Sequence, residues 1–291
     1  MIQLLVNSVI TFGLIIIVTI SFSFIYKVTK FFHFAHAVVF TSGAYFTFLF
    51  KVWLGFPLFI AIPLAVACST ILGCAMDLTV YRTLRKRKAT SLVLLLASLG
   101  LNVVIQNVIS MVLGDDTKSI RTGDVQVGIE IFGAYITPTQ IGIIITSIVL
   151  VILTAIFLKY AKFGKAMRAV SNNPELALIS GIDSERTILY TFALGSALAG
   201  IAGILVALDV DMTPTMGMNA LMMGVVAMII GGVNSITGIV FGSLLLALAQ
   251  NFGVWKISSQ WQDAIAFIIL FLFLLIKPEG FLGKKIKKVS V

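Results

Sequence analysis

Stretches of about 20 mostly apolar residues recur along the whole chain, and this is the length that a helix needs to cross a bilayer. They cover residues 2–26, 31–50, 57–81, 89–113, 139–158, 188–208, 220–251 and 262–277. Of the 291 residues, 59% are hydrophobic and 11% are charged, which excludes a water-soluble fold. The sequence therefore predicts an all-α polytopic membrane helical bundle, one domain over 1–291, with about eight apolar segments, or eight to ten when broken helices are counted.

Basic residues gather in three short segments. Of the 21 Lys and Arg residues, five lie in 82–88, five in 159–186 and five in 277–288, whereas 114–140 is acidic. Lys and Arg are enriched in the cytoplasmic loops of membrane proteins. We therefore expect a multi-pass protein of the cell (inner) membrane whose three basic segments are cytoplasmic and whose acidic loop faces out. Because the charge is divided among membrane loops, it does not indicate a nucleic-acid partner.

Two apolar segments contain residues that interrupt a membrane helix. If 220–251 crossed only once, the basic tail would lie on the opposite side from the cytoplasmic segment 159–187. The run Gly231-Gly-Val-Asn-Ser-Ile-Thr-Gly238 is also a poor helix former. We expect 220–251 to divide into two pieces that are either re-entrant or cross twice. Segment 31–50 has a similar polar run; the N-terminus lies outside if this segment spans and inside if it is re-entrant.

Interrupted helices line transport paths, because their freed backbone groups need polar surroundings. We expect the two interruptions to meet near the middle of the membrane. The candidate path residues are His33, His36, Asn102, Gln106, Gly231, Gly232, Asn234, Ser235, Thr237 and Gly238. Packing alone explains the clustered glycines poorly, whereas Asn102 and Gln106 fit hydrogen bonds across helices equally well.

Several kinds of chemistry are excluded by the residues that the chain lacks. The two histidines have no Cys or carboxylate nearby in sequence, and zinc needs three or four ligands, so we expect no metal site and no cofactor. No Asp, Glu, Lys or Arg lies at the centre of a predicted span, and the phosphate-binding G-x-x-x-x-G-K-[ST] loop is absent. Since no nucleophile–base pair is found either, the sequence does not predict an enzyme.

Two further patterns predict local structure. Gly195, Gly200 and Gly203 form a face of small residues that lets helices approach closely. In the acidic loop, apolar and polar residues alternate over 125–131, which is the period of a β-strand and predicts a small surface hairpin.

The basic segment 159–187 contains a predicted surface helix. Asn173 is placed to cap it, Pro174 suits its first position, Glu175–Ser180 continues it and Gly181 ends it. The segment carries the apolar residues Leu176, Ala177, Ile179 and Ile182. Apolar side chains on a charged surface helix favour docking into a groove of another protein over a solvated loop.

Four groups of motifs resemble one protein family over nearly the whole chain. They are His33-Phe-Ala-His-Ala37 with Gly43-Ala-Tyr45, Tyr81-Arg-Thr-Leu-Arg85, the run Gly231–Gly238, and the segment containing Gly164-Lys-Ala-Met-Arg-Ala-Val170, Asn173-Pro-Glu-Leu-Ala177 and Ser180-Gly-Ile-Asp183. The chain resembles the inner-membrane permeases of branched-chain amino acid ABC importers, specifically the H-type subunit.

The resemblance implies a transport subunit that works with two ATP-binding cassette subunits, a second related permease in a heterodimer or homodimer, and an extracytoplasmic substrate-binding protein. It also implies contact with the ATPase through Gly164, Arg168, Asn173, Pro174, Glu175, Ala177, Leu178 and Gly181. The chain departs from the family pattern at His33, Ala37, Val38 and Asn234. Urea or short amides therefore remain alternative substrates, and a stand-alone channel or ion-coupled carrier is the alternative of another class.

Overall fold

The computed structural model describes residues 1–121, 128–131, 133–233, 235–277 and 279–282. Its helices are α1 Ile2–Thr29, α2 His36–Phe48, α3 Leu58–Met76, α4 Arg82–Lys86, α5 Ser91–Leu113, α6 Pro138–Tyr160, α7 Lys162–Asn172, α8 Pro174–Ile179, α9 Ser184–Asp209, α10 Met216–Gly231, α11 Ile236–Lys256 and α12 Gln262–Ile276. The π-helical turns η1 Leu49–Trp53 and η2 Asp77–Tyr81 continue α2 and α3, and the 3-10 turn η3 Ser259–Trp261 precedes α12.

Seven helices in the described part of the chain are long and apolar enough to cross a membrane. They cover Ile2–Thr29, Leu58–Lys86, Ser91–Leu113, Pro138–Tyr160, Ser184–Asp209, Ile236–Lys256 and Ser259–Ile276. The predicted all-α polytopic bundle is thereby confirmed. The structure refines the eight predicted segments at two places: 31–50 forms the short helix α2 with η1, and 220–251 divides into α10 and α11.

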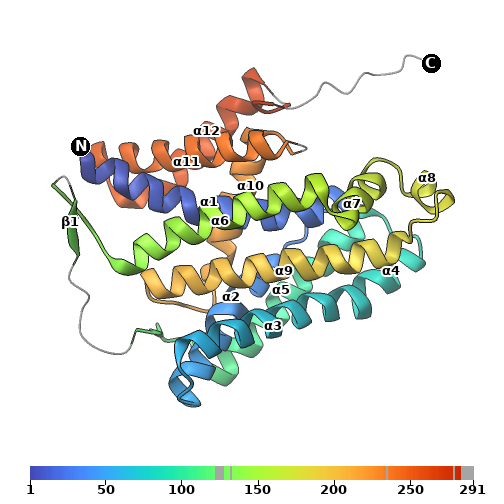
Figure 1. Ribbon diagram of the computed structural model, residues 1–291, viewed down its shortest axis with the longest axis horizontal. Helices are drawn as coiled ribbons and strands as arrows, with labels where there is room; N and C mark the ends of the chain where they lie inside the picture. The colour runs from blue at the N-terminus through green and yellow to red at the C-terminus, as the bar shows by residue number, and fades with distance from the viewer. Residues whose placement is uncertain (122–127, 132, 234, 278, 283–291) are drawn as a thin grey trace.

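The two ends of the bundle are distinct (Figure 1). The N-terminus lies beside a hairpin of β1 Ile129–Ile131 and β2 Ala134–Ile136, because Gln3 and Tyr135 exchange two hydrogen bonds of 3.0 and 2.8 Å. Helices α4, α7 and α8 lie at the other end (Figure 1). The hairpin agrees with the predicted one over 129–131, whereas the first part of the predicted strand, Val125 and Val127, lies outside the described residues. We call these the hairpin end and the α7 end.

Helix α1 runs from the hairpin end to the α7 end, where the Ser171 hydroxyl donates to the Lys27 carbonyl at 2.8 Å. The segment that follows returns to the hairpin end, since the Lys51 ammonium group donates to the Ile120 carbonyl at 2.8 Å. Segment 31–50 therefore takes the chain back across the bundle. Because α1 begins beside the hairpin and ends at the α7 end, the N-terminus lies at the end opposite to α7 and α8.

Small residues allow the central helices α1, α2 and α9 to pack at short distance. A β-carbon on Gly203 would overlap the Phe40 carbonyl, and one on Gly43 would overlap the backbone of Gly200. A β-carbon on Gly195 would lie 2.9 Å from the Ile25 side chain. The predicted close-packing face on α9 is confirmed. Because this packing lets α2 fit inside the bundle, all but one of the α2 residues are buried.

The outer helices carry large apolar side chains on the surface of the chain. Ile71 on α3, Met111 on α5 and Leu275 on α12 are 66%, 80% and 67% exposed. Continuous apolar surface of this kind is unfavourable in water and is the surface that lipid or another membrane subunit covers.

Replacing Gly203 by Leu should prevent α2 and α9 from packing, because the new side chain would overlap the Phe40 backbone. Overpacking of a core costs about 1–3 kcal/mol when side chains can shift, and a backbone that cannot shift makes this a lower bound. Gly142→Leu on α6 is the control, since a β-carbon there meets nothing within 4 Å. The yield of monodisperse protein in detergent and its melting temperature are the readouts. Equal yields of the two variants would contradict the packing role.

Candidate coupling surface and translocation path

The structure confirms the predicted start of the surface helix α8 at Pro174 and ends the helix at Ile179, one residue before the predicted Ser180. The Asn173 side-chain oxygen accepts from the backbone N–H groups of Glu175 and Leu176, at 3.0 and 3.1 Å. Pro174 occupies the first turn, and Gly181 has a φ of 81°, a conformation that favours glycine after a helix. Local signals alone therefore fix where this short helix begins and ends.

Helix α8 presents an apolar face outward at the α7 end. Leu176, Leu178 and Ile179 are 60%, 64% and 83% exposed, and Glu175 beside them is also exposed. Ala177 is buried instead: its carbonyl accepts from the Ile182 N–H at 2.9 Å, and it packs against the core of the chain. The outward surface consequently consists of Leu176, Leu178 and Ile179, while Ala177 anchors the helix.

Gly164 and Arg168 hold the turn between α6 and α7. A β-carbon on Gly164 would lie 2.7 Å from the Leu158 α-carbon, so glycine is needed where α7 folds back on α6. The Arg168 guanidinium donates to the Leu158 carbonyl, one of the acceptors that the end of α6 leaves unpaired. Gly164 and Arg168, two residues of the predicted coupling segment, therefore fix the position of α7, the helix that precedes α8.

An ionic network connects the start of α9 with the end of the α3 helix. The Arg85 guanidinium donates to both carboxylate oxygens of Glu185, at 3.1 and 2.8 Å, and to Asp77 at 2.7 Å. The Asp77 side chain is only 1% exposed. A bidentate, partly buried ion pair fixes the orientation of both partners. Glu185 lies in the first turn of α9, shortly after α8, so the network joins the α8 segment to α3.

Sequence reasoning did not find this network. Arg85 belongs to the basic segment 82–88 and to the motif Tyr81–Arg85, and neither pattern assigns it a carboxylate partner. The pairing joins residues 100 positions apart, which no local pattern encodes. The local signal for part of the network is that Arg85 follows Asp77 by about two helical turns.

The histidines lie where the linker after α1 enters α2: His33 is in the linker, His36 is the first residue of α2, and both are buried. His33 Nδ1 lies 3.0 Å from the Tyr81 hydroxyl, and His36 Nε2 lies 2.8 Å from the Ser21 hydroxyl. The other ring nitrogen of each histidine is buried without a hydrogen-bond partner in the described structure. The two rings, 5.7 Å apart, thus form a polar layer with spare hydrogen-bonding capacity.

Helix α5 adds polar groups to this region. The Ser98 hydroxyl accepts from the Phe34 N–H at 3.0 Å, which places Ser98 against the linker. Asn102 and Gln106 follow at intervals of four residues and so continue the same face of α5. Asn102 is buried and Gln106 half-buried, whereas Asn107 is exposed and donates to the backbone of its own helix at 2.7 Å.

The second interruption serves close packing and chain reversal. β-Carbons on Gly231 and Gly238 would each collide with the backbone of the other glycine, and Gly232 has a φ of 97° where α10 ends. Ser235 caps α11 by accepting from the Gly238 N–H at 3.0 Å. Thr237 is exposed, and Asn234 lies outside the described residues. Packing thus gives these glycines a structural role that the sequence suggested only weakly.

The expected meeting of the two interruptions stays a prediction: Val233 of the second packs on the same apolar cluster as Phe32 and Phe34 of the first. Helix α2 contacts α10 at Gly217, whose N–H donates to the Thr41 hydroxyl at 3.2 Å. Gly231 is 14 residues further along α10, or about 21 Å at 1.5 Å per residue. The backbone freed at each interruption is paired locally: Ser98 serves the first, and the Phe281 and Leu282 N–H groups donate to the Ile230 and Gly231 carbonyls at the second.

Comparison with known proteins relates this architecture to transport permeases. The chain is 29% identical to the high-affinity branched-chain amino acid transport system permease protein LivH of Escherichia coli K12, covering 94% of this chain and 92% of LivH. It is also 29% identical to the corresponding permease protein BraD of Pseudomonas aeruginosa, covering 99% and 97%. A probable branched-chain amino acid transport permease protein LivH of Methanocaldococcus jannaschii is 27% identical, covering 99% and 94%.

Among solved structures, PsaBC from Streptococcus pneumoniae in complex with Fab has a similar fold. The TM-score is 0.54 at 14% sequence identity, over 95% of this chain and 93% of that one. The family model described as branched-chain amino acid transport system / permease component matches residues 4–274. The chain belongs to this family of membrane transport permeases.

Proposed function

We propose that this chain is the membrane permease subunit of an ATP-driven ABC importer for branched-chain or related amino acids. The exposed apolar face of α8, at the basic end of a membrane bundle of this family, is the observation that carries the proposal. The α7 end and the tail are cytoplasmic, and the N-terminus and the hairpin face outward, in agreement with the distribution of Lys and Arg.

The partners of the chain supply the functions that a permease subunit lacks, namely ATP hydrolysis and substrate capture. A permease component implies ATPase and binding-protein partners. We propose two ATPase subunits, each docked on an α8 segment, and a second related permease that covers exposed apolar surface of this one. The binding protein delivers substrate at the hairpin end. The permease itself carries out no chemical step; it moves the substrate.

Coupling passes from α8 to the interior through connected elements. Helix α8 leads into α9 within five residues, and Glu185 in the first turn of α9 holds Arg85, which also holds Asp77. A displacement of α8 by the ATPase therefore moves α9 and the end of the α3 helix together. The segment 159–187 acts as the coupling segment, with Gly164 and Arg168 as its support.

We place the translocation path along the polar layer of His33, His36, Asn102 and Gln106. These groups are neutral hydrogen-bonding side chains inside an apolar bundle. One ring nitrogen of each histidine has no hydrogen-bond partner among the described residues. Such groups replace water around a zwitterionic amino acid without trapping a charge. The run from Gly231 to Gly238 closes the second interruption at the edge of this path.

Replacing Leu178 by Asp should remove ATPase docking, because the variant would bury an unpaired carboxylate in an apolar interface. We expect association with the ATPase to weaken by about tenfold or more, and ATP-dependent leucine uptake by proteoliposomes to be lost. Gln260→Asp adds the same charge at an exposed position in η3, outside α8 and outside the segment 159–187, and should leave both intact. Leucine uptake by the chain alone, without ATPase and ATP, would instead establish a stand-alone carrier.

Replacing Arg85 by Met should uncouple ATP hydrolysis from transport, because Asp77 and Glu185 would lose their shared partner. We expect ATPase association and basal hydrolysis to persist while leucine uptake falls about tenfold or more, since a broken buried pair costs about 3–5 kcal/mol. Arg87→Met, an exposed neighbour, is the control. A normal ratio of uptake to hydrolysis in Arg85→Met would contradict the coupling role.

Replacing Asn102 by Trp should obstruct the path, because the side chain is buried one turn along α5 from Ser98, which contacts the linker before α2. Leucine uptake should fall to background while basal ATP hydrolysis continues, since α8 lies at a distance. Asn107→Trp on the exposed side of α5 should retain uptake within about twofold, as surface substitutions usually cost little. If both variants transport equally, the path runs elsewhere.

A further inference from the structure

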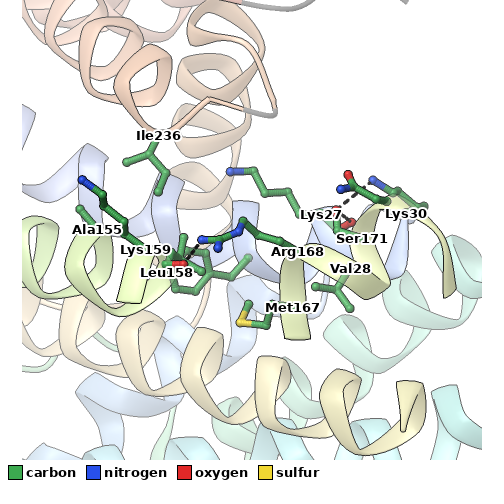
Figure 2. A pocket seen from close by; sticks show the side chains of 12 residues that line it. Lys27, Val28, Lys30, Ala155, Leu158, Lys159, Met167, Arg168, Ser171 and Ile236 are labelled. Carbon is green, nitrogen blue, oxygen red and sulfur yellow. Dashed lines mark hydrogen bonds between the residues drawn. The ribbon is translucent and has the colours of Figure 1, made fainter. Parts of the chain in front are cut away.

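A cavity of about 560 Å³ lies at the α7 end, between α1, α6, α7 and the first residue of α11. Apolar side chains form one wall, among them Phe24, Val28, Met167 and Ile236. Figure 2 shows Lys27 and Arg168 extending in the same direction into this space, with Lys159 on the opposite wall. The cavity therefore combines apolar side chains with cationic groups that extend from two facing walls.

The cavity contains four charged groups of the same sign. Lys27, Lys30, Lys159 and Arg168 line it, and no Asp or Glu among the described residues does. None of the four forms an ion pair within the described residues. Like charges repel in a partly dehydrated space, so an arrangement of this kind is stabilised by an anion.

Part of the hydrogen-bonding capacity of these groups is unused. The Lys30 ammonium group lies 3.4 Å from the Ser171 hydroxyl, and one Arg168 nitrogen donates to the Leu158 carbonyl. No hydrogen bond of the Lys27 or Lys159 ammonium group is found in the described part of the chain. Burial lowers the pKa of Lys30, and a bound anion would offset that effect. The donors needed to hold a phosphate are thus present and available.

The position of the cavity selects the kind of anion. Lys27 lies in the last turn of α1 and Lys159 in the last turn of α6, so the cations sit where two membrane spans end. Part of the apolar lining, Phe24 and Val28 on α1 and Ala155 and Leu158 on α6, comes from adjoining turns of these spans. A ligand that satisfies both sides carries a phosphate and a hydrocarbon chain, as an anionic phospholipid does. Free phosphate would leave the apolar wall uncovered.

We propose that this cavity is a binding site for the headgroup phosphate of an anionic membrane phospholipid. Lys27, Lys159 and Arg168 hold the phosphate, and the wall of Phe24, Val28 and Ile236 receives the start of an acyl chain. Because α7 forms part of the cavity and continues into α8, a bound lipid ties the docking segment to the membrane surface. The site would make the position of α8 depend on the lipid composition of the membrane.

Native mass spectrometry of the purified full chain, titrated with phosphatidylglycerol, tests the proposal. We expect Lys27→Gln/Lys159→Gln to bind this lipid about thirtyfold more weakly than the unchanged protein. Lys27→Arg/Lys159→Arg keeps both charges and should retain binding. Lys86→Gln/Arg87→Gln removes two exposed charges outside the cavity at the same end and should also retain it. Phosphatidylcholine should not compete.

Three results would overturn the proposal. Equal loss of binding in the cavity and control variants would mean that net charge alone attracts the lipid. Displacement of phosphatidylglycerol by millimolar inorganic phosphate would identify soluble phosphate as the occupant. Unchanged binding in Lys27→Gln/Lys159→Gln would place the lipid elsewhere. Because the measurement needs no ATPase, its failure is distinguishable from failure of docking at α8.

Discussion

Pairing of main-chain polar groups inside hydrocarbon is the constraint on which this structure depends. An unpaired N–H or carbonyl group there costs several kcal/mol, so each interruption of a helix must bring its own partners. Ser98 supplies them to the linker before α2, and the residues after α12 supply them to the end of α10. Both short helices, α2 and α10, exist inside the bundle only because these partners are present.

Close packing of the backbones makes the contact between α2 and α9 rigid. Backbone contact at Gly43, Gly200 and Gly203 leaves no space for α2 and α9 to slide past each other. In the proposed coupling, α9 moves as a body when its first turn is displaced. The Arg85–Glu185 ion pair and the stacking of Tyr81 on Phe192 join α9 to the end of the α3 helix, so that end would follow the motion.

Features determined by neighbouring residues could be predicted from the sequence, whereas contacts between distant residues could not. The cap of α8 at Asn173 and its end at Gly181 are encoded within nine residues, and the structure reproduces them. Clustered glycines are compatible both with a cavity and with close backbone contact, so their spacing in the sequence does not determine which of the two they form. Gly231 and Gly238 belong to the second case. The burial of Ala177 could not be predicted from the sequence either, since a helix of six residues has too few turns to define an apolar face.

The distribution of charge links transport with orientation. In the proposed path the side chains are neutral hydrogen-bonding groups, so a zwitterionic substrate would meet no fixed charge that holds it, and weak binding is consistent with specificity that resides in an external protein. The cations are instead concentrated where the spans end, and the proposed orientation of the bundle rests on this distribution. Lys27 and Lys159 occupy a cavity at that end without a carboxylate partner. Their counter-charge must therefore come from outside the chain, and at the end of a membrane span the nearest abundant anion is the phosphate of a lipid.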